Sequence, residues 1–173
     1  MAEEIKKQTF KLSEYDGMIR EVLNKDGHFR MYPRGTSMLP LIRQEIDSVV
    51  LVKADGDIKV GEIAFYLRDD GHYVLHRIVG KKTGAKNTGE SVSNNNDSTG
   101  EHVFYTMCGD NQLKREEGIR RDQIIGVVEC VYRKEKEVSG KNVIYRLYVL
   151  LWKSFFIRRV YFKLRSIRNR LTK

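Results

Sequence analysis

The stretch RGTSMLPL, residues 34–41, decides how the rest of the chain is interpreted, because it sets a serine between a glycine and a proline. Gly35 permits backbone angles that other residues resist, while Pro40 has a fixed φ and no backbone N–H. Pro40 also disfavours helical angles at the residue before it. The stretch therefore predicts a tight loop that presents the hydroxyl of Ser37 outward. If the loop stood alone, an ordinary turn serine would be the preferred interpretation.

Three further short motifs follow, and each lies in or at the edge of a strand-like run. They are GEIAFY at residues 61–66, LHRIVG at 75–80 and CGDN at 108–111. Ser37, His76 and Asp110 supply a hydroxyl, an imidazole and a carboxylate, which are the parts of a nucleophile, a base and an orienting group. Each has a plainer alternative, since a lone histidine is often a buried core residue and Asp110 fits a turn aspartate.

The ordered pattern Gly-x-Ser-Met-x-Pro, Gly-Glu-Ile, His-Arg-Ile-Val-Gly and Gly-Asp-Asn resembles the boxes of type I signal peptidases, whose relatives include the self-cleaving SOS and phage repressors. The resemblance covers roughly residues 31–131. It implies a signal-peptidase/LexA-like domain of coiled β-sheets. It also implies a serine endopeptidase that cleaves a precursor, signal or leader peptide after small residues. Besides Ser37, His76 and Asp110, the residues that match the motifs are Gly35, Met38, Pro40, Arg77, Gly109 and Asn111.

Histidine stands here where bacterial signal peptidases carry a lysine base, which resembles the archaeal, endoplasmic-reticulum and sporulation-type branch with Ser-His chemistry. Histidine has an unperturbed pKa of about 6.5, so it needs little tuning to act as a base near neutrality. Arg77 cannot take that role, because a guanidinium stays protonated. The resemblance assigns Asp110 as the group that orients His76. A second acid is expected several residues later, and Glu116, Glu117 and Asp122 all remain candidates.

Acyl transfer also needs an oxyanion hole, and the backbone N–H of Ser37 is the natural donor. Some members of the family add a hydroxyl two residues before the nucleophile, where this chain has Gly35. We expect backbone donors, with the Thr36 hydroxyl beside them, and Met38 packed inward to seat the loop. The sequence has no metal-ligand spacing, Walker loop or dinucleotide fingerprint, so no cofactor is expected.

The remaining pattern predicts a mainly β domain. A helix is expected over residues 13–24, and Asp-Asp-Gly at 69–71 predicts a hairpin turn. Polar residues predict a flexible loop at 81–102, and residues 112–123 are expected to be exposed. Strands are expected at 28–33, 48–53, 62–68, 72–79, 102–108 and 124–132. The predicted domains are a helical extension at 1–30, a catalytic β domain at 31–132 and a basic amphipathic helical tail at 133–173.

Charge is distributed very unevenly along the chain. Residues 133–173 hold 13 Lys and Arg against 2 Glu, whereas residues 1–132 hold 19 Lys and Arg against 21 Asp and Glu. The basic tail therefore predicts an anionic partner. Cys108 and Cys130 lie in apolar runs and are expected to be buried free thiols rather than a disulfide framework.

Residues 143–157 of the tail are almost entirely apolar, but at ~1.5 Å per residue they are too short to span a bilayer. We expect a helix at the membrane interface, with Tyr148, Trp152 and Phe155 in the lipid and the basic end on anionic headgroups. The alternative is that the apolar part packs on the β domain. Nucleic acid is a lesser alternative, since the aromatic residues cluster apart from most of the cations.

Residues 1–7 contain no apolar core of the kind found in a signal sequence or an N-terminal anchor. The expected localisation is therefore peripheral or monotopic membrane association, and otherwise the cytoplasm. Two other functions remain as alternatives to the peptidase. One is a self-cleaving regulator, and the other is a non-catalytic module on the same scaffold that binds a membrane or nucleic acid through its tail.

Overall fold

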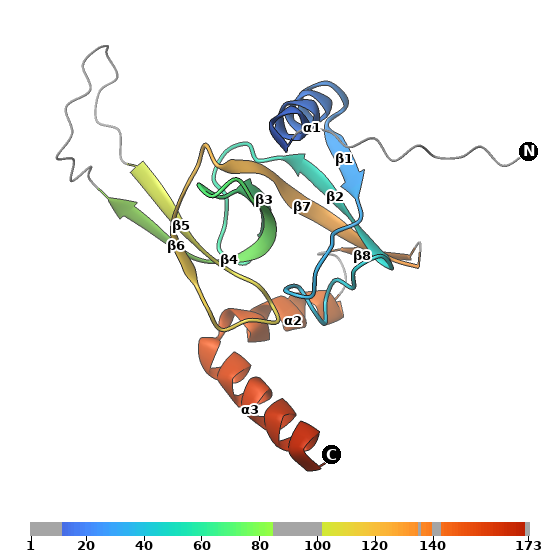
Figure 1. Ribbon diagram of the computed structural model, residues 1–173, viewed down its shortest axis with the longest axis vertical. Helices are drawn as coiled ribbons and strands as arrows, with labels where there is room; N and C mark the ends of the chain where they lie inside the picture. The colour runs from blue at the N-terminus through green and yellow to red at the C-terminus, as the bar shows by residue number, and fades with distance from the viewer. Residues whose placement is uncertain (1–11, 85–101, 135, 140–142, 172–173) are drawn as a thin grey trace, which may run out of the picture.

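A computed structural model describes residues 12–84, 102–134, 136–139 and 143–171. The described residues form a mainly β protein with three helices (Figure 1). The helices are α1 (Leu12–Asp26), α2 (Val143–Lys153) and α3 (Phe155–Leu171). The strands are β1 (His28–Met31), β2 (Asp47–Lys53), β3 (Ile63–Leu67), β4 (Tyr73–Gly84), β5 (His102–Cys108), β6 (Glu116–Arg120), β7 (Ile124–Arg133) and β8 (Lys136–Ser139).

All strand pairs in the sheet are antiparallel. The strand order is β1-β2-β7-β3-β4-β5-β6, and β8 pairs with β7 outside this path. β7 joins the two parts of the sheet, because it pairs with β2 along one edge and with β3 along the other. Bulges in the β2–β7, β3–β7, β4–β5 and β5–β6 pairings bend the sheet. Figure 1 shows the strands coiled around β3 rather than laid flat.

Two apolar cores pack on opposite faces of β3, since Phe65 belongs to the first and Tyr66 to the second. The first includes Ile19 and Leu23, so one face of α1 is buried against β1, β2 and β7. The second centres on Tyr66, Ile78 and Met107, all fully buried. Because α1 and β1 contribute to the first core, the described part of the predicted N-terminal extension is an integral part of the β domain.

The structure confirms the hairpin at Asp-Asp-Gly, where Gly71 has φ 82° and the backbone N–H of Arg68 donates to the carbonyl of His72. It confirms Cys108 and Cys130 as buried free cysteines. Two loop predictions need correction. β4 continues to Gly84, into the predicted loop, whose residues 85–101 lie outside the described residues. The stretch 112–123 contains β6, which the sequence did not suggest.

The predicted helical tail begins with β8 and then forms two helices with a break at Ser154. Tyr148 is half-buried and Trp152 is only 8% exposed, because both pack on the β domain and stack on each other with ring centroids 4.7 Å apart. The prediction that these two rings enter lipid is therefore wrong. The expected lipid contact of Phe155 cannot be placed, since its side chain lies outside the described set.

Candidate active site

The serine loop follows β1 and is held by its own backbone and by Met38. Gly35 adopts φ 90°, which lies in the left-handed region. Glycine tolerates this region, as the sequence led us to expect at this position. Met38 is 4% exposed and belongs to the first core, which confirms that it seats the loop from inside. Its carbonyl accepts a hydrogen bond of 3.0 Å from the N–H of Ile42. Ser37 itself stays half-buried at the surface of this loop.

The turn after β5 clamps the serine loop from the other side. The backbone N–H of Asn111 donates to the Ser37 carbonyl at 2.7 Å, and the Asn111 side-chain amide donates to the Thr36 carbonyl at 3.1 Å. A Cβ at Gly109 would lie only 2.7 Å from the same Ser37 carbonyl, so only glycine fits there. Gly109 and Asn111 therefore help to fix the position of Ser37 in its loop.

His76 lies on β4 and is 2% exposed. Its Nδ1 lies 3.3 Å from Glu116 Oε1 and 3.3 Å from the Tyr66 hydroxyl. The Tyr66 hydroxyl donates its single proton to Glu116 Oε2 at 2.8 Å, so the proton between Nδ1 and these oxygens must come from the histidine. Nδ1 is then the protonated nitrogen, and Nε2 keeps a lone pair with which it can accept a proton.

Glu116 is held as a carboxylate by Arg68, whose Nε donates to Oε2 at 2.8 Å and whose Nη2 donates to Oε1. Burial raises the pKa of Glu116, but the hydrogen bonds from Arg68 and Tyr66 outweigh it and leave that pKa below its ordinary value. Burial lowers the pKa of His76 below 6.5, although the charge of Glu116 acts in the opposite direction. The ring is thus a neutral base at neutral pH.

Ser37 and His76 line one cleft of about 250 Å³. Within the described chain no hydrogen bond joins the two side chains, and such contacts often tighten only when substrate binds. Arg68 and Gln112 also line this cleft and, on their other side, a second hollow of about 490 Å³. The other residues that line the first cleft are Pro33, Arg34, Gly35, Met38, Ile42, Tyr73, Val74 and Leu75.

The structure gives Asp110 a different place from the one expected. Its side chain is fully buried and forms a bidentate ion pair with Arg77, in which Nε donates to Oδ1 at 2.8 Å and Nη2 donates to Oδ2 at 2.6 Å. The Tyr148 hydroxyl donates to Oδ2 at 2.9 Å, and Arg158 Nη2 approaches Oδ1 at 3.4 Å. The expected hydrogen bond to His76 is not among these contacts, so the assignment of Asp110 as the orienting group needs correction.

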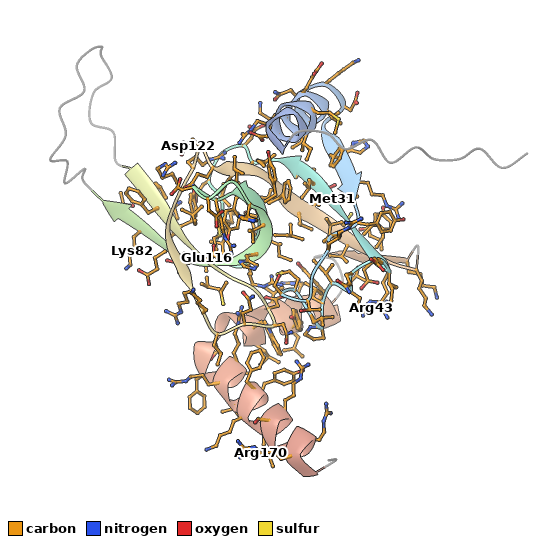
Figure 2. The ribbon with its side chains drawn as sticks, viewed as in Figure 1. Met31, Arg43, Lys82, Glu116, Asp122 and Arg170 are labelled. Carbon is orange, nitrogen blue, oxygen red and sulfur yellow. The ribbon has the colours of Figure 1, made fainter. Side chains whose placement is uncertain are left out.

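The carboxylate that meets His76 is Glu116, one of the three candidates for a second acid. Met107 pairs with Glu116 in the β5–β6 ladder, and this register turns the carboxylate inward. Glu117 and Asp122 are instead exposed surface partners of Lys82 and Arg120. Figure 2 shows Glu116 inside the curve of the strands and Asp122 at the rim.

Arg77 joins two of the sequence motifs. Besides binding Asp110, its Nη1 donates to the carbonyl of Gly61 at 2.7 Å. Gly61 has φ 107°, and its backbone N–H donates to the carbonyl of Ile78 on β4 at 2.8 Å. The GEIAFY, LHRIVG and CGDN motifs therefore meet at one buried arginine, which comes directly after His76 in strand β4.

The tail closes over this ion pair. The Trp152 indole N–H donates to the Asp110 carbonyl at 2.8 Å, and the fully buried Arg158 donates to the carbonyls of Trp152 at 2.6 Å and Gly109 at 3.0 Å. Farther along α3, Arg165 Nη1 donates to Asn111 Oδ1 at 2.8 Å. The sequence did not suggest Arg158 or Arg165, because arginines in a basic helix usually face solvent.

The N–H of Ser37 has no acceptor among the backbone hydrogen bonds of the described loop, so it is available to an oxyanion. Thr36 is exposed beside it. Among the described residues no group of three or more His, Cys, Asp and Glu side chains could hold a metal ion. Comparison of the chain with protein-family models, curated proteins and solved structures gave no match.

Proposed function

We propose that the protein is a serine endopeptidase of the signal-peptidase type, with Ser37 as nucleophile, His76 as general base and Glu116 as the group that orients His76. The observation that carries the proposal is the His76–Glu116–Tyr66 contact, because it leaves Nε2 as the unprotonated nitrogen of a buried ring that lines the same cleft as Ser37. The ordered sequence motifs and the coiled antiparallel sheet support the assignment to a signal-peptidase/LexA-like fold.

In the proposed reaction, Ser37 Oγ gives its proton to His76 Nε2 and bonds to the scissile carbonyl carbon. The carbonyl π electrons move to the oxygen, which the Ser37 N–H stabilises. Collapse of this intermediate breaks the C–N bond, and His76 returns the proton to the leaving amine. Water then gives a proton to His76 and bonds to the carbonyl carbon of the acyl-enzyme. Collapse of this second intermediate breaks the bond from that carbon to Ser37 Oγ, His76 returns the proton to Oγ, and the new carboxyl end is released.

The substrate is proposed to be an extended segment of a precursor, signal or leader peptide. Val74 and Leu75 line the cleft from strand β4, and Met38 and Ile42 line it from the serine loop. Polar side chains also line this cleft of about 250 Å³, among them Arg34, Arg68 and Gln112. The proposed preference for small residues next to the scissile bond rests on the resemblance to signal peptidases.

A fluorophosphonate probe tests the proposal without a known substrate, because it forms a covalent bond with an activated serine. We expect the full-length wild type to be labelled once, and the Ser37→Ala and His76→Ala variants to stay unlabelled. Ser166→Ala is the matched control, since Ser166 is exposed on α3 far along the tail. Labelling of Ser37→Ala at the wild-type rate would contradict the proposal.

A further inference from the structure

A set of large apolar side chains is exposed on the last two helices. We call it the outer stripe, and it consists of Val143, Leu147, Leu150, Leu151, Phe156, Val160, Leu164 and Ile167. These are eight of the twelve large apolar side chains exposed in the described chain, so the exposure is concentrated in one region. Phe156 is 76% exposed and Leu150 66%, which is unusual for side chains of this size.

Helical spacing places the outer stripe opposite the residues that bind the domain. In α2 the stripe residues recur every three or four positions, whereas Tyr148 and Trp152 turn toward Asp110. In α3 the stripe again recurs every three or four positions, and the fully buried Arg158 lies on the opposite side. The contacts to the domain are therefore already satisfied, and the outer stripe has no role in them.

Cations flank the outer stripe, and no acid is present. Residues 143–171 contain eight Lys and Arg and no Asp or Glu. Arg146, Arg159, Lys163 and Arg170 are exposed on these helices. Figure 2 shows Arg170 near the end of α3 that lies away from the sheet. Within the described chain, no helix is both long enough and apolar enough to cross a bilayer.

We propose that the outer stripe of α2 and α3 docks on the surface of an anionic membrane, with its apolar side chains among the acyl chains and its cations on the headgroups. A helix that combines an apolar face with a cationic border lies in the plane of such an interface. A second copy of this chain fits poorly, because pairing two outer stripes would bring two acid-free cationic borders together. Nucleic acid would satisfy the cations but leave the apolar side chains in water.

This surface differs from the simple sequence expectation for the tail. Tyr148 and Trp152 face the domain, so the membrane meets the aliphatic side of α2 and Phe156 of α3. Helices α2 and α3 also cover Asp110, so deleting them would expose the buried ion pair between Asp110 and Arg77. Point substitutions in the full chain therefore make a sounder test than a truncation.

The test is flotation of the full chain with phosphatidylcholine vesicles, with and without phosphatidylglycerol, at low salt. We expect the wild type to float with the anionic vesicles and to remain behind with the neutral ones. Leu147→Glu combined with Leu164→Glu should weaken binding by about tenfold or more. Met18→Glu combined with Ile46→Glu is the matched control, because it makes the same charge change at exposed apolar residues outside the tail and should bind as the wild type does.

Three results would overturn the proposal. The first is a wild type that does not float with anionic vesicles. The second is a Leu147→Glu, Leu164→Glu variant that floats as well as the wild type. The third is a wild-type dimer that dissociates in this variant while neither protein binds vesicles, which would assign the outer stripe to a second copy. Serine labelling is measured separately, so failure of this proposal leaves the peptidase proposal standing.

Discussion

Two carboxylates, those of Glu116 and Asp110, lie near the cleft. They differ in how deeply they are buried and in which side chains contact them. Glu116 keeps 21% of its side chain exposed and contacts the titratable ring of His76. Asp110 is fully buried between Arg77 and Arg158, which cannot give up their protons. The first carboxylate can respond to a proton that moves on and off His76. The second holds three sequence motifs and the tail together.

This comparison teaches that an aspartate in a motif that resembles a catalytic box need not contact the histidine. Arg77 and Arg158 occupy both oxygens of Asp110, and Tyr148 adds a third donor. A carboxylate with this many donors has no acceptor site left for an imidazole. Glu116 accepts hydrogen bonds from Arg68 and Tyr66 and also contacts His76 Nδ1, so its charge acts on the ring.

The largest expected effect concerns stability at Asp110. Asp110→Ala leaves Arg77 and Arg158 buried without a counter-charge, so we expect the free energy of unfolding to fall by about 3–5 kcal/mol. Urea denaturation followed by circular dichroism measures this change. Asp122→Ala is the control, because Asp122 is an exposed acid whose loss should be nearly neutral. A variant at position 110 as stable as the control would refute the architectural role.

The next effect concerns activity at Glu116. Glu116→Gln removes the negative charge that faces Nδ1 and can offer the ring an N–H in place of an acceptor, which favours the wrong tautomer. We expect the rate of Ser37 labelling to fall by about 10²- to 10³-fold. Stability should change by only about 1 kcal/mol, since the partner Arg68 is partly exposed to water.

Glu117→Gln provides the matched control for Glu116→Gln, because it makes the same change at the next residue, where the side chain is exposed. It should label at the wild-type rate. If both variants labelled equally fast, Glu116 would have no part in activating Ser37, and the comparison with Asp110 would lose its basis.

The smallest expected effect concerns Tyr66. Tyr66→Phe removes one hydrogen bond to Glu116 but leaves the Arg68 pair and the contact between His76 and Glu116 in place. We expect a loss of about 1 kcal/mol in stability and about fivefold in labelling rate. A larger loss than that of Glu116→Gln would transfer the orienting role from the carboxylate to the phenol.

Most of the β framework was predictable, because β2, β3, β5 and β7 are runs of apolar and β-branched residues bounded by turn signals. β6 was not, since in Glu-Glu-Gly-Ile-Arg only Ile119 is apolar and the strand forms through its pairing with β5. The role of Glu116 depends on that pairing, so sequence alone left three acids open. Asp110 illustrates the opposite case, in which a clear motif singled out the residue but predicted neither its ion pair with Arg77 nor its contact with Arg158 on α3.

The most direct test of the central claim is the pH dependence of Ser37 labelling in the wild type. Burial lowers the pKa of His76, so the ring stays neutral down to a pH below 6.5 and loses its ability to accept the Ser37 proton only under more acidic conditions. The account predicts a labelling rate that is level near neutral pH and falls along a single acid limb below pH 6.5. A rate that is negligible at neutral pH and rises only in the alkaline range would contradict the assignment of His76 as the base.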